Sequence, residues 1–558
     1  MGNMDVLVSV GMYLRTIRRR NKDGSVVEYL QLAHNVRRPN GVVCAEVVHN
    51  FGRADQVDRE ALHRLARSLH RLDAVESEGW DAGLVVQRSR PLGGAHLLQH
   101  LWEQLGIVAQ LRELQQEREF ESDVERVLFA LVANRCLAPS SKLGACEWVA
   151  QDVVIQGLEQ LEVQQAYRAM DFLLENQEEV QERVFFQVAE LLQLEVDLIF
   201  FDTTSSYFEI EGEDDEEGLR RFGYSRDGRP DRAQVAIGLA VTKEGIPVRC
   251  WVFPGNTADA STVEQVKQDL HGWKLDRVVL VADRGMSSKE NLQLLRQDGG
   301  QYIIGERMRS GVPVVEEALS RPGRYRRLQD NLEVKEVVVG SGRRAQRYVI
   351  CRNPEEAERD RARRELLLQE LEQALLELDQ TAVHQRRACA LRISRRFGKY
   401  VRQLPDGRLA LNREVVVREE RLDGKYLIHT SDRQLSTEEV ALGYRQLLQV
   451  ERGWRDLKQE LDLRPMFHRK EDRIRANVLL CFLGLLLIRV AENRTQQTWP
   501  RIRRELQRLV LVDLSGPAGQ VSQTSQPTPA QTQLFEALQV PAPIRVRAAS
   551  SSSQPEAA

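Results

Sequence analysis

Hydrophobic and polar positions change their pattern several times along the chain. Over 1–55, apolar runs alternate with turn signals and predict a small N-terminal β module with hairpin turns at Lys22-Asp23-Gly24 and Pro39-Asn40-Gly41. Over 56–195, apolar residues recur at helical spacing, as in VERVLFALVANRCLAP, and predict a helical domain. Over 196–305, short apolar runs predict three strands in meander order, a helix, and two more strands separated by a helix. This order predicts an α/β fold with a mixed sheet.

The second half of the chain changes pattern again. Residues 306–435 combine a long charged helix with a Gly-punctuated, β-rich stretch, and helical spacing resumes over 436–512. The apolar run NVLLCFLGLLLIRV, residues 477–490, is too short to span a bilayer, so we interpret it as a buried core helix and expect no membrane partner. Residues 513–558 are rich in Ser, Gln, Pro and Ala, and we expect a mostly disordered tail.

Charge and cysteine content narrow the class of protein. The net charge of −3 does not indicate a polyanion partner, but 79 Lys and Arg residues allow local basic surfaces. The seven cysteines are scattered, odd in number and never spaced as CxxC, which argues against a zinc site and against a secreted disulfide framework. The N-terminal residues lack the order of a signal peptide. We therefore expect a cytoplasmic protein.

Two predicted strands run into an acid at their carboxyl ends. LIFFDTTSSYFE leads into Asp202, and DRVVLVADRGMSS leads into Asp283. Either acid alone is better explained as the cap of the following turn. Two acids at matching ends of two strands point instead to a shared site, where the carboxylates repel each other unless a divalent cation lies between them. Oxygen ligands without nearby Cys or His favour Mg²⁺ or Mn²⁺ over zinc.

A third acid lies in YRQLLQVERGWRDLKQELDLRP. Tyr444, Glu451 and Lys458 are each seven residues apart, so an uninterrupted helix would present all three on one face. The alternative is an ordinary amphipathic helix with surface charges. The order of Asp202, Asp283 and Glu451 nevertheless places a third carboxylate after the two strand acids.

Together these segments resemble the DDE insertion-sequence transposases of bacteria. The third segment resembles the Tyr-x2-Arg-x3-Glu-x6-Lys signature of one large group of them, in which the glutamate is the third catalytic acid. Leu447 replaces the signature arginine, which removes one contact with the DNA end unless Arg445, Arg452 or Arg455 substitutes for it. WVFPGNTADAST and GYSRDGRPDRAQ also resemble inter-strand segments of this group.

The resemblance implies a fold and a reaction. The fold is a ribonuclease-H-like mixed-sheet catalytic core, interrupted by a β-rich insertion between its second and third acids. Asp202, Asp283 and Glu451 are the implied catalytic residues and metal ligands, with Asp202 shared between two Mg²⁺ or Mn²⁺ ions. The implied reaction is cleavage of a DNA strand by water, followed by attack of the freed 3′-hydroxyl on a second phosphate.

DNA contacts are expected from basic residues near the third acid and within the insertion. The candidates for DNA binding are Tyr444, Lys458, Arg452, Arg455, Arg392, Arg395 and Arg396. The alternative for the insertion residues is a solvated charged face. Phe397, Tyr400 or Trp454 is the aromatic expected to stack if a base leaves the helix.

Three functions fit these residues. The first is a DNA transposase that acts as a homodimer on two element ends and associates with the nucleoid, with the helical domain as a possible binder of the DNA end. The second is a metal-dependent nuclease that cuts without joining, which uses the same acids. The third is a non-catalytic DNA-binding derivative, which has no reason to keep all three acids.

Overall fold

The computed structural model describes most of the chain. The described residues are 13–20, 26–37, 43–54, 56–57, 85–115, 122–210, 212–273, 278–306, 308, 312–342, 345–379, 384–516 and 519–551. They form two compact units. Unit 1 comprises Met1–Val188, Leu457–Leu463 and Phe467–Ala558, and unit 2 comprises Ala189–Asp456 and Arg464–Met466.

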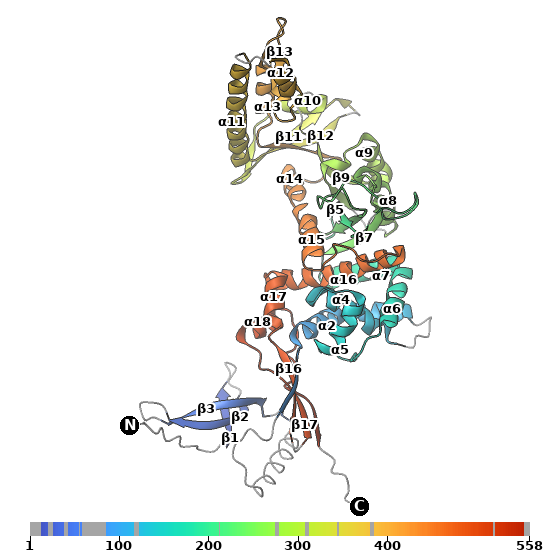
Figure 1. The fold of residues 1–558 in the computed structure, drawn as a ribbon, viewed down its shortest axis with the longest axis vertical. Coiled ribbons are helices and arrows are strands. Elements are labelled where there is room, and N and C mark those ends of the chain that lie inside the picture. Colours follow the sequence, from blue (N-terminus) through green and yellow to red (C-terminus); the bar gives the residue numbers. More distant parts are fainter. Residues whose placement is uncertain are drawn as a thin grey trace, which may run out of the picture. The chain divides into compact units, whose positions relative to one another are not determined.

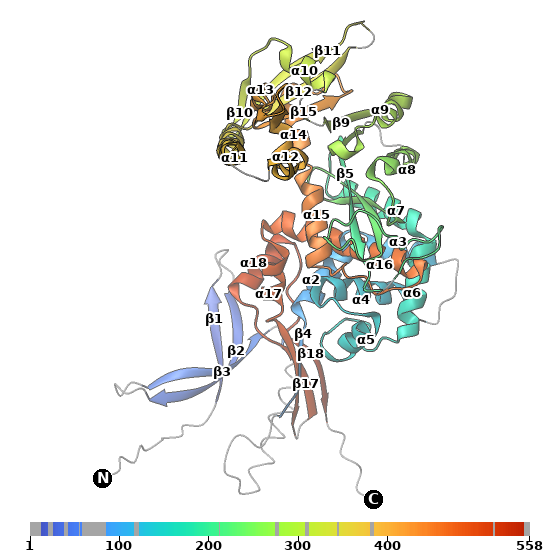
Figure 2. The ribbon, with the colours of Figure 1, turned by 45° about the horizontal axis from the view of Figure 1, so that its top comes forward.

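Unit 1 contains two antiparallel sheets. β1 (Tyr13–Arg20), β2 (Val26–Arg37) and β3 (Val43–Arg53) form a three-stranded sheet, which confirms strands in the N-terminal β module (Figure 1). Its two predicted hairpin turns lie outside the described residues. The second sheet has the order β18-β17-β16-β4. Its strands are β4 (Val85–Pro91), β16 (Val510–Gly516), β17 (Gly519–Thr524) and β18 (Val546–Ser551), which lie side by side (Figure 2).

The rest of unit 1 is helical. The helices are α2 (Gly93–Gln104), α3 (Ile107–Gln115), α4 (Val124–Leu137), α5 (Lys142–Gln151), α6 (Val163–Glu175), α7 (Gln177–Leu191), α16 (Glu471–Thr495), α17 (Trp499–Leu506) and α18 (Pro529–Ala537). α4 is buried along its whole length, and α16 is buried from Ala476 to Glu492. Helices that are buried on every side need neighbours on every side, and α4, α6 and α16 pack against one another.

α16 has the length and composition of a membrane-spanning helix, with a mean hydropathy of 2.0 in its most apolar window. That window is 94% buried inside the protein, as in the core helix of a globular domain. The helix is longer than the apolar run 477–490 on which the prediction rested, because further turns extend it at both ends. The interpretation as a buried core helix fits its packing.

Unit 2 is built on a nine-stranded mixed sheet of order β10-β11-β12-β15-β9-β8-β5-β6-β7. Five strands form its first part: β5 (Leu198–Tyr207), β6 (Gln234–Val241), β7 (Pro247–Pro254), β8 (Val279–Ala282) and β9 (Gln301–Glu306). β5, β6 and β7 are an antiparallel meander, while β8 and β9 run parallel to β5. This order confirms the predicted α/β fold with a mixed sheet.

Helices connect and cover these strands. They are α8 (Asp259–Gly272), the 3₁₀ turns at Arg284–Met286 and Gln297–Gly299, α9 (Lys289–Arg296), α14 (Thr437–Arg445) and α15 (Leu448–Gln459). β6 is buried at every position, as expected of a central strand covered on both faces.

The insertion after β9 extends the same sheet. β10 (Arg326–Gln329), β11 (Leu332–Val339), β12 (Gln346–Arg352) and β15 (Lys425–Thr430) pair antiparallel, and β15 joins β9. The remaining elements are α10 (Pro313–Ser320), α11 (Pro354–Asp379), α12 (His384–Ile393), the 3₁₀ turn Gly398–Tyr400, β13 (Val401–Gln403), β14 (Leu409–Leu411) and α13 (Arg413–Glu420). Val315, Tyr348 and Leu427 belong to one insertion core, and Leu371, Tyr400 and Val416 form a second.

Two predicted boundaries need correction. The expected disordered tail is wrong within 513–551, because this stretch contains β17, α18 and β18 as well as the end of β16. The predicted helical domain also contains a strand, β4, which pairs with β16. Leu457–Leu463 and the chain from Phe467 onward, which the prediction assigned to the catalytic core, pack with unit 1.

Candidate active site

Asp202 and Asp283 lie on neighbouring strands. β5 and β8 pair in parallel from Leu198 with Val279 to Phe201 with Ala282. Asp202 and Asp283 are the next residues on the two chains, so they stand side by side where this parallel pairing ends. The buried, apolar strands fix the positions of both acids, because a shift of one residue would turn each side chain to the opposite face.

The sequence predicted that this strand ends at Asp202, but β5 extends beyond it. It continues to Tyr207, and Asp202 pairs across from Leu239 of β6. The continuation contains Thr203 and Thr204, and β-branched residues favour strands. β6 pairs with β5 along this whole extension, so only the β8 side of β5 opens at Asp202.

Glu451 comes from α15 and lines the same cavity as the two strand acids. The cavity has a volume of about 330 Å³. It is lined by Asp202, Asp283, Asn331, Leu332, Asn353, Tyr426, Tyr444, Arg445, Leu447, Leu448, Val450 and Glu451. The three acids that the sequence singled out, from two strands and one helix far apart in the chain, therefore face one space within unit 2.

The helix that carries Glu451 is not continuous with the segment that carries Tyr444. α14 ends at Arg445 and α15 begins at Leu448, with Gln446 as the C-cap of α14. The predicted single helix face through Tyr444, Glu451 and Lys458 is therefore wrong. Gly443 lowers the helix propensity just before the break. Its lack of a side chain also lets α14 approach the sheet, because an added Cβ at Gly443 would lie 3.2 Å from Leu198 Cδ1 and 3.6 Å from Ile303 Cδ1.

Tyr444 holds one of the acids. Its hydroxyl donates a hydrogen bond to Asp283 Oδ1 at 3.3 Å. Burial, and after it the Asp283 carboxylate, raises the pKa of the tyrosine, so the hydroxyl remains a donor. Tyr444 lies against Gly305 of β9, where an added Cβ would be 2.1 Å from the tyrosine hydroxyl oxygen. The centroid of the Tyr444 ring is 5.9 Å from that of Tyr426.

Asp202 has a perturbed pKa. Burial raises the pKa to about 6, and the carboxylates of Asp259 and Asp283 also raise it. The positive charge of Arg226 and a backbone hydrogen bond at Thr203 act in the opposite direction. Perturbed carboxyl groups that line a cavity are candidates for functional sites.

Arg226 and Asp259 form a hydrogen-bonded triangle with Thr203, the residue after Asp202. Arg226 donates to Thr203 Oγ1 at 2.8 Å and to Asp259 Oδ2 at 2.6 Å, and Thr203 donates to Asp259 Oδ1 at 2.5 Å. The sequence gave no role to this arginine and acid. The signal was available, because they lie in the two inter-strand segments GYSRDGRPDRAQ and WVFPGNTADAST that carry the family resemblance.

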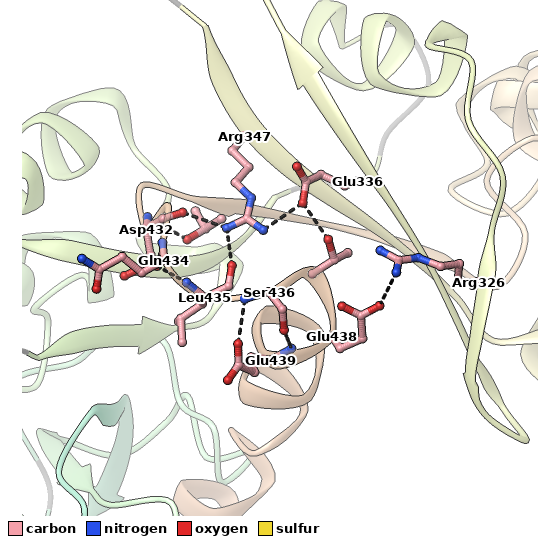
Figure 3. Close-up of polar contacts among 11 residues, drawn as sticks. Arg326, Glu336, Arg347, Asp432, Gln434, Leu435, Ser436, Glu438 and Glu439 are labelled. Atoms are coloured by element: carbon pink, nitrogen blue, oxygen red, sulfur yellow. Dashed lines mark hydrogen bonds and ion pairs between the residues drawn. The ribbon is translucent and has the colours of Figure 1, made fainter.

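A polar network anchors the start of α14 to the insertion strands (Figure 3). Arg347 of β12 donates to the backbone oxygens of Asp432 and Leu435 at 2.9 and 2.7 Å, and to Glu336 Oε2 of β11 at 2.8 Å. Thr437 donates to the same Glu336 oxygen at 2.6 Å. Because α14 leads directly to α15, this network ties the segment before Glu451 to the sheet.

The structure also places the residues predicted to bind DNA. Arg392, Arg395 and Arg396 are exposed in the insertion, although Arg396 pairs with Glu370 at 2.6 Å and Arg392 donates to Gln403 at 2.9 Å. Arg455 is exposed on α15, whereas Arg452 and Lys458 are partly buried and engaged in contacts. Tyr444 faces Asp283.

The donor set fits a divalent cation in chemical type, since all three acids offer oxygen ligands. Among the described residues, however, no three His, Cys, Asp or Glu side chains are grouped tightly enough to hold an ion as they stand. The acids share one cavity without converging on one point.

Comparison with known proteins identifies the family. A model described as the transposase DDE domain matches residues 197–487, more than half of the chain. The chain thus belongs to the DDE transposases, and it is a DNA transposase that cleaves and transfers DNA strands. A second model, the N-terminal domain of IS1634 family transposases, matches residues 14–78, so the finer likeness is to an insertion-sequence transposase of that type. The DDE domain implies dependence on a divalent metal ion and DNA as the partner.

The remaining comparisons add little. The piggyBac transposase, in a cryo-EM structure of its synaptic complex with hairpin DNA, is 11% identical with a TM-score of 0.33. The match covers 74% of this chain and 78% of that chain, but at this TM-score the likeness is too weak to add to the assignment. None of the curated proteins matches the chain.

Proposed function

We propose that Asp202, Asp283 and Glu451 are the three catalytic acids of this transposase and its metal ligands. The observation that carries the proposal is that all three line one cavity of unit 2. Their origin, from the end of a parallel strand pairing and from a helix after an insertion, also supports the assignment.

The three acids would hold two Mg²⁺ or Mn²⁺ ions, and Asp202 would be a ligand of both. When bound, such ions activate the attacking oxygen and stabilise the leaving oxygen of the phosphodiester. The three acids share the cavity, and binding of a cation to all of them would require Glu451 and the strand acids to lie closer together. Asp202 and Asp283 directly follow paired strands of the sheet, whereas Glu451 lies on the helix α15.

The neighbouring side chains keep the acids in a competent state. Tyr444 orients Asp283 through its hydrogen bond at 3.3 Å. Arg226 favours the ionised form of Asp202, the form that binds a cation. Asp259 accepts from Arg226 and Thr203, which holds the guanidinium beside β5.

The reaction has two displacements on phosphorus. In the first, water attacks the phosphate at the element end, a P–O bond forms to the water oxygen, and the 3′-oxygen leaves and takes up a proton. In the second, this 3′-hydroxyl attacks a phosphate of the target, and the displaced 3′-oxygen of the target leaves. The first step hydrolyses one phosphoester bond, and the second exchanges one phosphoester bond for another, so joining needs no external energy source.

Several separate surfaces would hold the DNA. Arg392, Arg395 and Arg396 of the insertion would contact phosphates, and Lys458, Arg452, Arg455 and Tyr444 would contact the element end. The helical domain would add an end-binding surface. The working form would be a homodimer on paired ends, acting in the cytoplasm on nucleoid DNA.

The decisive experiment separates the transposase from a nuclease that only cuts. A duplex with the element end, which the DNA flanking the coding region defines, is incubated with supercoiled plasmid and Mg²⁺. We expect products joined to the plasmid from the parent protein and none from Asp202→Ala, Asp283→Ala or Glu451→Ala, which should still bind the duplex. Cleavage without joined products would favour the nuclease, and cleavage at the parental rate by any one variant would remove that residue from the site.

A further inference from the structure

α14 is tied at both ends to β10, the edge strand of the insertion. Near the start of the helix, Glu438 pairs with Arg326 at 3.1 Å, and at its end Arg445 donates to Gln329 Oε1 at 2.6 Å. The Arg326 side chain is 69% exposed, so its ion pair contributes little stability by itself. A stronger attachment comes from the next two strands.

This attachment is the ion pair of Glu336 on β11 and Arg347 on β12, which meets the first turn of α14 (Figure 3). One Glu336 oxygen accepts from both Arg347 and Thr437, at 2.8 and 2.6 Å. The Arg347 side chain is only 17% exposed, so solvent screens this pair less than a surface pair. Although burial acts to raise it, Arg347 and Thr437 hold the pKa of Glu336 below its ordinary value, and both groups of the pair are charged.

Arg347 also fixes the loop that leads into α14. Its guanidinium donates to the backbone oxygens of Asp432 and Leu435. The buried Asp432 carboxylate in turn accepts from the backbone N–H groups of Gln434 and Leu435 at 2.8 and 2.7 Å, and Ser436 caps the first turn of the helix. The point from which α14 starts is therefore set by a hydrogen-bonded loop and one guanidinium.

The other end of α14 reaches the acids. Tyr444 donates to Asp283, and the break before α15 is itself hydrogen-bonded: the N–H of Leu447 donates to the Tyr444 oxygen, and the N–H of Glu451 to the Leu447 oxygen, both at 3.2 Å. A helix of 9 residues is about 13 Å long, so a tilt of about 10° at its start moves its end by about 2 Å. Such a shift is enough to break the bond between Tyr444 and Asp283.

We propose that Arg347 and Glu336 are positioning residues of the catalytic site, which act through α14 to hold Tyr444 on Asp283 and Glu451 at the cavity. The inference rests on the proposed function, because it needs these acids to be catalytic. Neither Arg347 nor Glu336 is among the residues that line the cavity, so their effect passes through the helix. The insertion would thus have a second role besides DNA contact, as the support of the third acid. It also contributes Asn331, Leu332, Asn353 and Tyr426 to the cavity lining.

Two substitutions test this role from the two sides of the contact. Arg347→Met removes the guanidinium and keeps an unbranched side chain, and Thr437→Val removes only the hydroxyl that bonds Glu336. Cleavage of the element-end duplex is followed in single turnovers with Mg²⁺ and saturating protein, so that the rate constant does not depend on affinity. Both variants should cleave about 10-fold or more slowly, because small displacements of catalytic groups are costly.

The matched control is Arg352→Met. Arg352 pairs with Glu333 at 3.2 Å across the same two strands. Glu333 and Glu336 point to opposite faces of β11, because an odd number of positions separates them, so the control pair lies on the face away from α14. Arg352→Met should therefore cleave at the parental rate, although it also loses an ion pair between β11 and β12.

A double substitution tests the route through the helix. If Arg347 acts through α14, Arg347→Met and Tyr444→Phe disturb the same bond to Asp283, and the combined loss of rate should be smaller than the product of the two separate losses. A loss equal to the product would show that Arg347 acts independently of Tyr444 and would overturn the proposed route.

The remaining outcomes separate this inference from the proposed function. Parental rates in both Arg347→Met and Thr437→Val, with Asp283→Ala inactive, would overturn the positioning role alone. The same holds if these variants unfold at lower temperature or bind DNA more weakly but cleave at the parental rate when saturated, because Arg347 would then be a structural or DNA-contacting residue. Cleavage by Asp283→Ala at the parental rate would instead overturn the catalytic assignment.

Discussion

Replacing Asp202 by Asn should abolish catalysis and, at the same time, stabilise the metal-free protein. The pKa of Asp202 is raised from 3.8 to about 6, chiefly by burial. The folded-state value thus lies above the unfolded one, so the ionised side chain destabilises the fold. This cost is absent below about pH 3.8 and complete above about pH 6. Asn keeps the size of the side chain and removes the charge.

The magnitude follows from the size of the shift. At 1.36 kcal/mol per pKa unit, a rise from 3.8 to about 6 costs about 3 kcal/mol at pH 7.5. At pH 5 the unfolded chain is already ionised while the folded protein is mostly protonated, and the cost falls to roughly half. Asp202→Asn should therefore gain about twice as much stability at pH 7.5 as at pH 5.

Thermal unfolding in EDTA at the two pH values measures this effect. The variant should unfold several degrees above the parent at pH 7.5, with a smaller difference at pH 5. Added Mn²⁺ should stabilise the parent and leave the variant unchanged, because a ligand that binds the folded state raises its stability. A variant less stable than the parent at pH 7.5, or a gain that grows toward pH 5, would refute the reasoning about burial.

Three further predictions concern the neighbours of the acids. Tyr444→Phe should slow cleavage about 10-fold or more, since the lost bond is to a charged group; an unaltered rate in single-turnover assays would remove its orienting role. Lys458→Ala should reduce the slope of log affinity against log salt by about one, and an unchanged slope would exclude a phosphate contact. A third protein, with substitutions at Arg392, Arg395 and Arg396, should keep its catalytic acids but bind the element end poorly. If one subunit cuts the end that the other subunit holds, mixing this protein with Glu451→Gln should restore cleavage that neither protein shows alone. Full-rate cleavage by a monomeric complex would contradict this prediction.

The strand acids were predictable because their signals are local. Each apolar run is a buried strand, and each acid follows directly, so the register of two parallel strands brings Asp202 and Asp283 together. The mixed sheet was predictable for the same reason, from the order of apolar runs. The family resemblance then pointed to Glu451, whose own segment is an ordinary amphipathic pattern.

What the sequence missed depends on contacts between distant residues. Arg226 and Asp259 are separated by 33 positions, and only the folded chain shows that they meet at Thr203. The break after α14 was missed because Gly443 and Tyr444 are placed by packing against the sheet, which overrides the seven-residue spacing. The C-terminal strands were missed because Ser- and Gln-rich composition hid alternating runs such as VLVDLSG, whose partner β4 lies more than 400 residues away.

The central claim is that Asp202, Asp283 and Glu451 together hold the catalytic metal. Anomalous diffraction from a complex with element-end DNA and Mn²⁺ tests it most directly, with Ca²⁺ as the matched inactive ion. The account predicts Mn²⁺ peaks coordinated by Asp202, with Asp283 and Glu451 completing the ligands beside the scissile phosphate. Mn²⁺ bound elsewhere, for instance by the acidic residues Glu213–Glu217, with no peak at Asp202, would contradict it.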